Sequence, residues 1–354
     1  MKIVKIHKSR ISEVNFLNLT FGEEFTDHMF VCDYEKGKWI NPEIIPYEEF
    51  KMSPSSSVLH YGQSIFEGMK AYKDVENQVF MFRPEENFKR LNKSAKRLSI
   101  PEFPKNYFFK ALEILLNIDK NWIIPGIGNS LYIRPFVFAN QASVQASPAN
   151  KYKFLIICTP VKAYYSNKVN VLIAEKYSRA ANGGVGFAKA AGNYAAQFYP
   201  TSLAQKKGYE QIIWTDANNH EYLEEAGTMN IFFRIGEDLI TAPNNDRILD
   251  GVTRKSIIEL CEYSKIKIQV RPITIKELLT AHKDNSLKEI FGSGTAVVIL
   301  PIKSFSYKNI HYKLFDQKDP ISEHLKKKIT DIQYNISKDP FKWRYKLPNL
   351  TSLK

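Results

Sequence analysis

GGVGFAKAAGNYAA, residues 183–196, is the stretch on which the fold assignment depends, because it sets one lysine among small, uncharged neighbours. A lysine that burial desolvates loses its proton more readily and becomes a nucleophile toward carbonyl groups. Lys189 fits that description, although the same neighbours also suit an exposed lysine on a helix. The glycines do not form a phosphate-binding motif, because Ala190 stands where a P-loop has Ser or Thr and Lys189 occupies the last glycine position of GxGxxG. NAD binding and ATP hydrolysis therefore lose their strongest signals.

The segments around this stretch predict short strands joined by turns, with helices between some of them. A strand is expected at VNVLIAEKY (residues 169–177), and a helix is expected to follow the Gly/Ala-rich stretch and to run to about Lys207. Many short strands with little βαβ alternation indicate a mixed α+β fold rather than a doubly wound one. The other expected elements are strands over 211–215 and 231–235, helices over 253–264 and 320–337, and a strand over 289–300 that Gly292–Gly294 interrupt.

The N-terminal half predicts two helices, and the length of the chain predicts two domains. Pro84 occupies a preferred first helical position, and a second helix is expected over 106–119. A chain of 354 residues is too long for one ordinary core. Strands are expected over 130–138 and 152–158, and the linker over 159–170. The predicted division is an N-terminal domain over 1–161, an interdomain loop over 162–170 and a C-terminal domain over 171–354.

Composition excludes several classes of protein. Hydrophobic residues make up 44% and charged residues 25%, as in an ordinary folded protein. The net charge is +13, but Lys and Arg are scattered, which argues against nucleic acid as a partner. The three cysteines have no CxxC spacing, so we expect neither disulfides nor a metal site. No apolar run is long enough for a signal or a membrane span, and we expect a cytoplasmic protein.

Several polar residues could bind an anion or a cofactor, and each also has an ordinary structural interpretation. Arg90 lies on the helix after Pro84 and could equally face solvent. Thr253 stands at a helix start, where backbone N–H groups bind anions, and could equally be a plain cap. Thr295 follows Gly292–Gly294, whose glycines allow close approach of a ligand. Glu225 enters a strand-like run, where a buried carboxylate needs a partner, and could equally lie in a turn.

These weak signals occur together, and the chain as a whole resembles the branched-chain aminotransferases within the fold-type IV enzymes that use pyridoxal 5'-phosphate. The resemblance covers the chain from about Phe21 to Trp343. It implies a smaller N-terminal α/β domain, a larger C-terminal domain with a β-barrel-like sheet, and a homodimer. Its strongest pieces are FTDHMF (25–30), LHYGQSIFEGMKAY (59–72), LYIRPF (131–136), the lysine stretch, EEAGTMNIFF (224–233) and FGSGTA (291–296).

The resemblance implies a role for each of the cofactor-binding candidates. Lys189 is similar to the lysine that carries the cofactor and moves the proton during transamination, the one catalytic residue we expect. Glu225 is similar to the partner of the pyridine nitrogen, and Tyr194 to the contact of the phenolic oxygen. Thr228 would lie beside the cofactor. The phosphate would be held by Arg90, Val252, Thr253 and Thr295.

The resemblance also implies the substrates and the residues that bind them. Branched-chain L-amino acids, their 2-oxo acids and the glutamate/2-oxoglutarate pair are expected to share one pocket and to react by a ping-pong mechanism. Apolar pockets separate substrates that differ by one methylene by only about 1–3 kcal/mol, so leucine, isoleucine and valine should all be accepted. The pocket walls would be Phe21, Tyr61, Phe66 and Tyr132, and the carboxylate contacts Tyr61, Arg134, Thr295 and Ala296.

The chain departs from the family pattern at two places, and two alternative functions stay open. Ala190 is smaller than the residue expected directly after the lysine, and no Gly-Pro pair follows downstream. Val297–Leu300 stand where the mammalian members have a CxxC, so the chain is similar to the bacterial type. The alternatives are another fold-type IV activity, D-amino acid transamination or aminodeoxychorismate lyase chemistry, and a non-enzymatic metabolite-binding or basic scaffold protein. Leucine against D-alanine as substrates, and the presence of a bound chromophore, would separate them.

Overall fold

The computed structural model describes residues 1–162 and 168–350, and the chain divides into two compact units. The first consists of Met1–Tyr164, Ala188–Ala191 and Asp331–Lys354, and the second of Tyr165–Phe187 and Gly192–Thr330. Ala188–Ala191, which includes the lysine, and residues 331–350 therefore group with the N-terminal unit, while the predicted domain boundaries stay a prediction. The predicted interdomain loop falls partly on residues 163–167, outside the described residues, and its boundaries stay a prediction.

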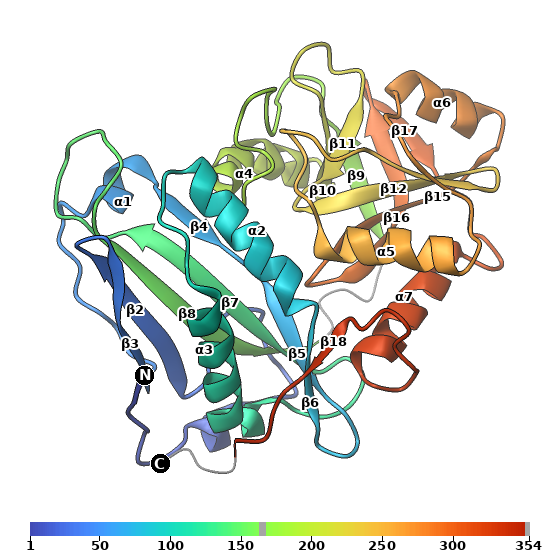
Figure 1. Cartoon of the computed structure of the whole chain (residues 1–354). Coiled ribbons are helices and arrows are strands. Elements are labelled where there is room, and N and C mark those ends of the chain that lie inside the picture. The colour runs from blue at the N-terminus through green and yellow to red at the C-terminus, as the bar shows by residue number, and fades with distance from the viewer. Residues whose placement is uncertain (163–167, 351–354) are drawn as a thin grey trace. The chain divides into compact units, whose positions relative to one another are not determined.

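The first unit is built on one nine-stranded sheet (Figure 1). Its strands follow the order β1-β3-β2-β8-β7-β5-β6-β18, β4 pairs with β7, and every pairing except that of β1 with β3 is antiparallel. The strands are β1 (Lys2–Ile3), β2 (His28–Glu35), β3 (Lys38–Pro46), β4 (Ser64–Phe66), β5 (Met69–Lys73), β6 (Val79–Phe82), β7 (Ser130–Ala139), β8 (Tyr152–Val161) and β18 (Arg344–Lys346).

Helices α2 (Pro84–Arg97) and α3 (Lys105–Ile118) match the two that the sequence predicts, within one residue at their starts. Pro84 is the first residue of α2, acidic residues occupy its first turn and basic residues its last, which suits the helix dipole. Helix α3 packs on β2 and β3 and buries the main apolar core of the unit against them. A short α1 (Ser57–Tyr61) and two single-turn 3-10 helices (Ile11–Glu13 and Lys120–Trp122) complete this unit.

The second unit contains a closed barrel. Strands β11-β10-β9-β16-β15-β12 are hydrogen-bonded in that order, and β12 pairs again with β11, which closes the ring. This confirms the expected mixed α+β fold with a barrel-like sheet. The strands are β9 (Val169–Ile173), β10 (Gln211–Thr215), β11 (Leu223–Ala226), β12 (Met229–Ile235), β13 (Asp238–Thr241), β14 (Ile268–Val270), β15 (Leu287–Gly294), β16 (Val298–Tyr307) and β17 (Ile310–Lys313).

The helices of the second unit carry its apolar faces inward. They are α4 (Ala191–Lys206), α5 (Val252–Tyr263), α6 (Ile275–Lys283) and α7 (Ile321–Gln333), which begins in this unit. Leu278 of α6 belongs to the same buried cluster as Ile213, Ile231 and Phe233 of the barrel strands. No helix within residues 1–162 and 168–350 has the length and apolar character needed to cross a bilayer.

The single strand that the sequence predicts over residues 289–300 is wrong. Residues 289–300 form parts of two antiparallel strands, β15 and β16, rather than one strand broken at its glycines. Gly292 and Gly294 lie inside β15 and pair with β16, so the turn comes later, at residues 295–297. A side chain at Gly292 would meet Met229, since its Cβ would lie 2.8 Å from the methyl group. These glycines therefore allow close packing on β12 and do not end the strand.

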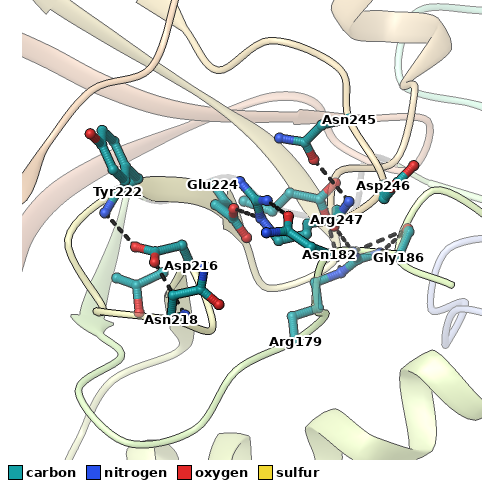
Figure 2. Close-up of polar contacts among 12 residues, drawn as sticks. Arg179, Asn182, Gly186, Asp216, Asn218, Tyr222, Glu224, Asn245, Asp246 and Arg247 are labelled. Carbon is teal, nitrogen blue, oxygen red and sulfur yellow. Dashed lines mark hydrogen bonds and ion pairs between the residues drawn. The ribbon is translucent and has the colours of Figure 1, made fainter. Parts of the chain in front are cut away.

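The turn after β10 depends on Asp216. Its carboxylate accepts hydrogen bonds from the backbone N–H groups of Asn218 (3.3 Å), Asn219 (3.0 Å), Glu221 (2.7 Å) and Tyr222 (2.7 Å), and Figure 2 shows those of Asn218 and Tyr222. Although burial raises the pKa of Asp216, these four donors outweigh it and hold the pKa below its usual value. The carboxylate is thus stabilised in its charged form.

Replacing this carboxylate should destabilise the protein in a pH-dependent way. Because the pKa is lower in the folded state, the contribution is present above the unfolded pKa of about 4 and is lost as the pH falls through the folded pKa. Asp216→Ala should lower the free energy of unfolding by about 1–3 kcal/mol at pH 7. Urea titrations of both proteins should show that difference shrinking below about pH 4. The exposed Asp319→Ala is the control, and an equal loss in it would contradict the explanation.

Candidate active site

Lys189 is held in the first unit through its own backbone. Its N–H donates to Ser94 Oγ of α2 at 2.9 Å, and its carbonyl accepts from the N–H of Phe66 at the end of β4 at 3.0 Å. Ala190 forms a bridge with Ile65 beside it. The Lys189 Nζ lies 4.9 Å from the centre of the Phe66 ring. The backbone contacts of residue 189 therefore direct its side chain, and they would form with any residue at this position.

Arg90 lies close to the same segment and is not a solvent-facing helix residue. It is buried, and its Nε and Nη2 donate to the two oxygens of Glu67 at 2.7 and 2.9 Å. Asn87, one turn earlier on α2, donates to Glu67 at 2.8 Å. A carboxylate and a guanidinium that meet through two parallel hydrogen bonds form one of the strongest polar contacts in proteins.

Four of the predicted pocket residues form one contact network beside the lysine. The Phe21 and Tyr132 rings meet edge-to-face, with centres 5.1 Å apart, and Arg134 Nη2 donates to the Tyr132 hydroxyl at 3.1 Å. The Arg134 guanidinium lies 4.6 Å from the centre of the Phe66 ring. Tyr61 is not in this network, because it is 47% exposed and its hydroxyl donates to the carbonyl of Val144. The role of Tyr61 therefore stays a prediction.

Glu225 lies in the second unit, in the middle of one rung of the barrel. It pairs with Asn230 on β12, which pairs with Ser293 on β15. Paired residues project to the same face of a sheet, so the three side chains lie in a row. Arg179 Nε is 3.0 Å from Glu225 Oε2, and the N–H of Leu249 donates to the other oxygen. Glu225 is thus a buried, charge-paired strand residue and not a turn glutamate.

The start of α5 lies next to this row. Asn230 Nδ2 donates to the Leu249 carbonyl at 2.8 Å, and a Cβ on Gly251 would come within 1.9 Å of Asn230 Oδ1. Val252 and Thr253 are the first residues of α5, and no side chain caps its first turn. Backbone N–H groups at such a start attract anions. The sequence expectation of an anion site at Thr253 therefore has the required local geometry.

The remaining candidates of the second unit lie at the ends of its strands and on α4. Thr228 is exposed in the turn between β11 and β12, and Thr295 and Ala296 lie half-buried in the turn between β15 and β16. Tyr194 is half-buried in the first turns of α4. Within the second unit the structure therefore joins Glu225 to the start of α5 and leaves the roles of these four residues as predictions.

A second pair of charges fixes the glycine-rich loop that leads to the lysine (Figure 2). Arg247 contacts both Glu224 and Asn182 through its guanidinium, and Arg179 donates to the carbonyls of Gly186 at 3.2 Å and Arg247 at 2.6 Å. A Cβ at Gly186 would lie 2.5 Å from the Arg247 carbonyl. Burial raises the pKa of Glu224, and Arg247 opposes that rise. Glu224 and Glu225, which are neighbours on β11, thus each form an ion pair with one arginine.

Comparisons with known proteins agree with this geometry. The model of the family described as amino-transferase class IV matches residues 64–305. A branched-chain-amino-acid transaminase of Bacillus subtilis is 43% identical over 92% of this chain and 93% of its own, and a second one from that organism is 41% identical over 95% and 94%. The chain belongs to the branched-chain aminotransferases of class IV.

Solved structures of branched-chain aminotransferases share the fold. One from Thermoproteus uzoniensis, determined with norvaline, has a TM-score of 0.75 and 24% identity over 91% of this chain and all of its own. The Escherichia coli enzyme has a TM-score of 0.73 and 24% identity over 91% of this chain and 99% of its own. At this identity the likeness concerns the fold alone.

Sequence reasoning missed four polar residues of this branched-chain aminotransferase. Glu67 lies within the motif LHYGQSIFEGMKAY (59–72), but the resemblance implied no role for it. Ser94 could have been found, because it follows Arg90 by one helical turn and must share its face. Arg179 and Arg247 have no local signal, since their partners lie far along the chain.

Proposed function

We propose that this chain is a branched-chain-amino-acid transaminase, which moves the amino group reversibly between L-leucine, L-isoleucine or L-valine and 2-oxoglutarate in two half-reactions. The observation that carries the proposal is the fixed placement of Lys189 beside the Glu67–Arg90 pair and the Phe66 ring. The names of the Bacillus subtilis relatives support the substrate class.

The residues present fit pyridoxal phosphate, on which class IV aminotransferases depend. A dianionic phosphate requires cations and N–H donors; Arg90 is a buried cation of the first unit, and the start of α5 offers backbone N–H groups in the second. A protonated pyridine nitrogen requires a carboxylate, which Glu225 supplies. Ser293 Oγ is buried on the face that carries Glu225, and no hydrogen-bond partner for it exists among the described residues. A polar ligand over this rung would give it one.

The proposed cofactor-binding roles are those that the family resemblance implies. Arg90, Val252, Thr253 and Thr295 would hold the phosphate, Tyr194 the phenolic oxygen and Glu225 the pyridine nitrogen, with Thr228 at the edge of the ring. Two solved structures of one further branched-chain aminotransferase contain pyridoxamine 5'-phosphate and N-(5'-phosphopyridoxyl)-L-glutamate, respectively. When bound, pyridoxal phosphate acts as an electron sink for the charge that develops at Cα.

Lys189 carries the acid–base chemistry. As a free amine it would take the proton from Cα of the amino acid and deliver it to C4′ of the cofactor, and the reverse transfer would serve the second half-reaction. Arg179 and the Leu249 N–H hold the Glu225 carboxylate in place, from where it would keep a proton on the pyridine nitrogen. Phe66, against which the lysine lies, excludes water from one side of the nitrogen.

The substrate side chain would lie against Phe21, Phe66 and Tyr132, with Arg134 at the rim for the second carboxylate of glutamate. A guanidinium over an aromatic ring stays charged while it covers an apolar surface. This arrangement allows one pocket to accept both an aliphatic chain and glutamate. Tyr61, Thr295 and Ala296 remain the proposed contacts of the α-carboxylate.

Gly68 should control the shape of this pocket. A Cβ there would lie 2.0 Å from the Tyr132 hydroxyl oxygen and 2.8 Å from the ring carbon that bears it. Gly68→Ala should therefore displace Tyr132 and raise KM for leucine roughly tenfold, with a smaller change in kcat. Steady-state kinetics with leucine measure this. Tyr132→Phe added to Gly68→Ala removes the nearer clash and should restore part of KM, and no restoration would show that the alanine acts elsewhere.

A homodimer is proposed for this chain because the N-terminal sheet has two apolar faces. Successive strand residues alternate, so Phe30 and Phe154 pack toward α3 while Met29 and Leu155 face the opposite side. On that side they form a second cluster with half-buried side chains of the same sheet. A second copy of the chain would cover this face, and the mass in solution by light scattering would test it.

The proposed function has a direct spectroscopic test. Purified protein supplied with pyridoxal phosphate should show a cofactor absorbance band that bleaches with L-leucine and returns with 2-oxoglutarate. A band that ignores leucine and responds to D-alanine would keep the fold and overturn the substrate. No band after addition of the cofactor would overturn the role of Lys189.

A further inference from the structure

A row of buried polar side chains follows one face of α2. Asn87, Arg90 and Ser94 are spaced by three and four residues, which places them on one side of the helix. All three are buried, although amphipathic helices usually direct such residues toward water. Their contacts are Glu67 for the first two and the backbone of Lys189 for the third. The row therefore joins the helix to the lysine segment.

Glu67 is the acceptor at the centre of this row. Its side chain is fully buried, and it accepts four hydrogen bonds: from Arg90 Nε (2.7 Å), Arg90 Nη2 (2.9 Å), Asn87 Nδ2 (2.8 Å) and the Gly68 N–H (3.2 Å). Four donors satisfy a carboxylate that has lost its contact with water. Burial raises the pKa of Glu67. The positive charge and hydrogen bonds of Arg90, together with Lys189 and Asn87, outweigh burial and hold the pKa below its usual value, so Glu67 is ionised at neutral pH.

Glu67 and Lys189 are also close to each other. Phe66, the neighbour of Glu67, binds the carbonyl of Lys189 and carries the lysine Nζ over its ring. The positive charge of Lys189 is one of the causes that hold the pKa of Glu67 down, so the two charged side chains attract each other. Arg90 on α2 and Arg134 on β7 bring further positive charge to the same region. The negative charge of Glu67 offsets part of this positive charge.

We propose that Glu67 is a positioning residue for the reaction, which orients the Arg90 guanidinium toward the cofactor phosphate and sets the charge balance at the Lys189 nitrogen. This rests on the proposed function. Two parallel hydrogen bonds fix the plane of the guanidinium, so they decide where its other edge faces. A buried ion pair that only stabilises the fold would leave the charge at the lysine unaffected, and this difference makes the two roles separable.

Two substitutions separate charge from geometry. Glu67→Gln keeps the shape and removes the charge, while Glu67→Asp keeps the charge and shortens the reach to Arg90. The matched control is Glu85→Gln, an exposed glutamate in the first turn of the same helix that pairs with Lys105. Each full-length protein is loaded with pyridoxal phosphate, and its fold is checked by thermal unfolding. The readouts are the rate of cofactor release and the pH midpoint of the cofactor absorbance.

Glu67→Gln should lower the pH midpoint by about one unit, because the positive form of the lysine nitrogen loses a neighbouring negative charge. Glu67→Asp should keep the midpoint and release the cofactor roughly tenfold faster, because Arg90 is no longer held by two bonds. A wild-type midpoint in Glu67→Gln, or wild-type release in Glu67→Asp, would overturn the inference. If Glu67→Gln does not fold, Glu67→Asp decides alone. Failure of the wild type to bind pyridoxal phosphate would instead overturn the proposed function.

Discussion

Lys189→Ala should lower kcat for the leucine and 2-oxoglutarate reaction by at least about 10³-fold, the largest effect expected of any single substitution in this chain. A positioned acid–base group contributes about 10²–10⁴ to a proton transfer, and here the same nitrogen also serves as the nucleophile. The measurement is the formation of glutamate over many turnovers. Because the N–H and carbonyl of residue 189 bind Ser94 and Phe66 whatever its side chain is, the variant should fold as the wild type does.

The control for this experiment is a lysine of the helix that follows. Lys206 lies exposed at the end of α4, and Lys206→Ala should leave kcat within about twofold of the wild type, as surface substitutions usually do. Multiple turnovers by Lys189→Ala at a rate near that of Lys206→Ala would show that another group moves the proton. In that case the assignment of Lys189 would be wrong, whatever the family resemblance implies.

Local patterns predicted the parts of the fold that local chemistry determines. The start of α2 at Pro84 follows from the restricted φ of proline and its missing N–H, so sequence reasoning places it to the residue. The strand over 211–215 is likewise bounded by its own β-branched and aromatic residues. Gly292 and Gly294 misled, because glycine ends a strand only where its neighbours do not hold it. Here Gly292 pairs with both β12 and β16, and Gly294 pairs with β16.

The sequence predicted the candidate site only in part, for the same reason. Lys189 and Glu225 were predicted from motifs, whereas the residues that hold them were not, because each contact joins distant parts of the chain. Ser94 approaches Lys189 only when α2 packs beside β4, and Arg179 meets Glu225 only when β11 joins the barrel. Arginine in a loop is usually exposed, so neither composition nor spacing marks it as buried. Long-range packing is the physical information that the sequence alone does not display.

Glu225→Gln should lower kcat by on the order of 10²–10³-fold, because a neutral amide cannot keep a proton on the group opposite it as a carboxylate does. The structure supplies an unusual control in the next residue. Glu224 is also buried on β11 and also pairs with one arginine, Arg247. Both glutamines leave an arginine with less compensation, Arg179 buried and Arg247 half-buried, so both variants should lose about 2–4 kcal/mol of unfolding free energy.

The comparison of the two variants isolates the chemical role of Glu225 from its structural role. Glu224→Gln should retain kcat within a few-fold, roughly 1 kcal/mol in the barrier, because that carboxylate holds Arg247 and the glycine-rich loop. Glu225→Gln should lose far more kcat than Glu224→Gln, although the two variants lose a similar amount of unfolding free energy. The kinetics of both are measured at saturating cofactor. Equal losses of kcat in the two variants would mean that Glu225 only holds Arg179, and the pyridine nitrogen would then need a different partner.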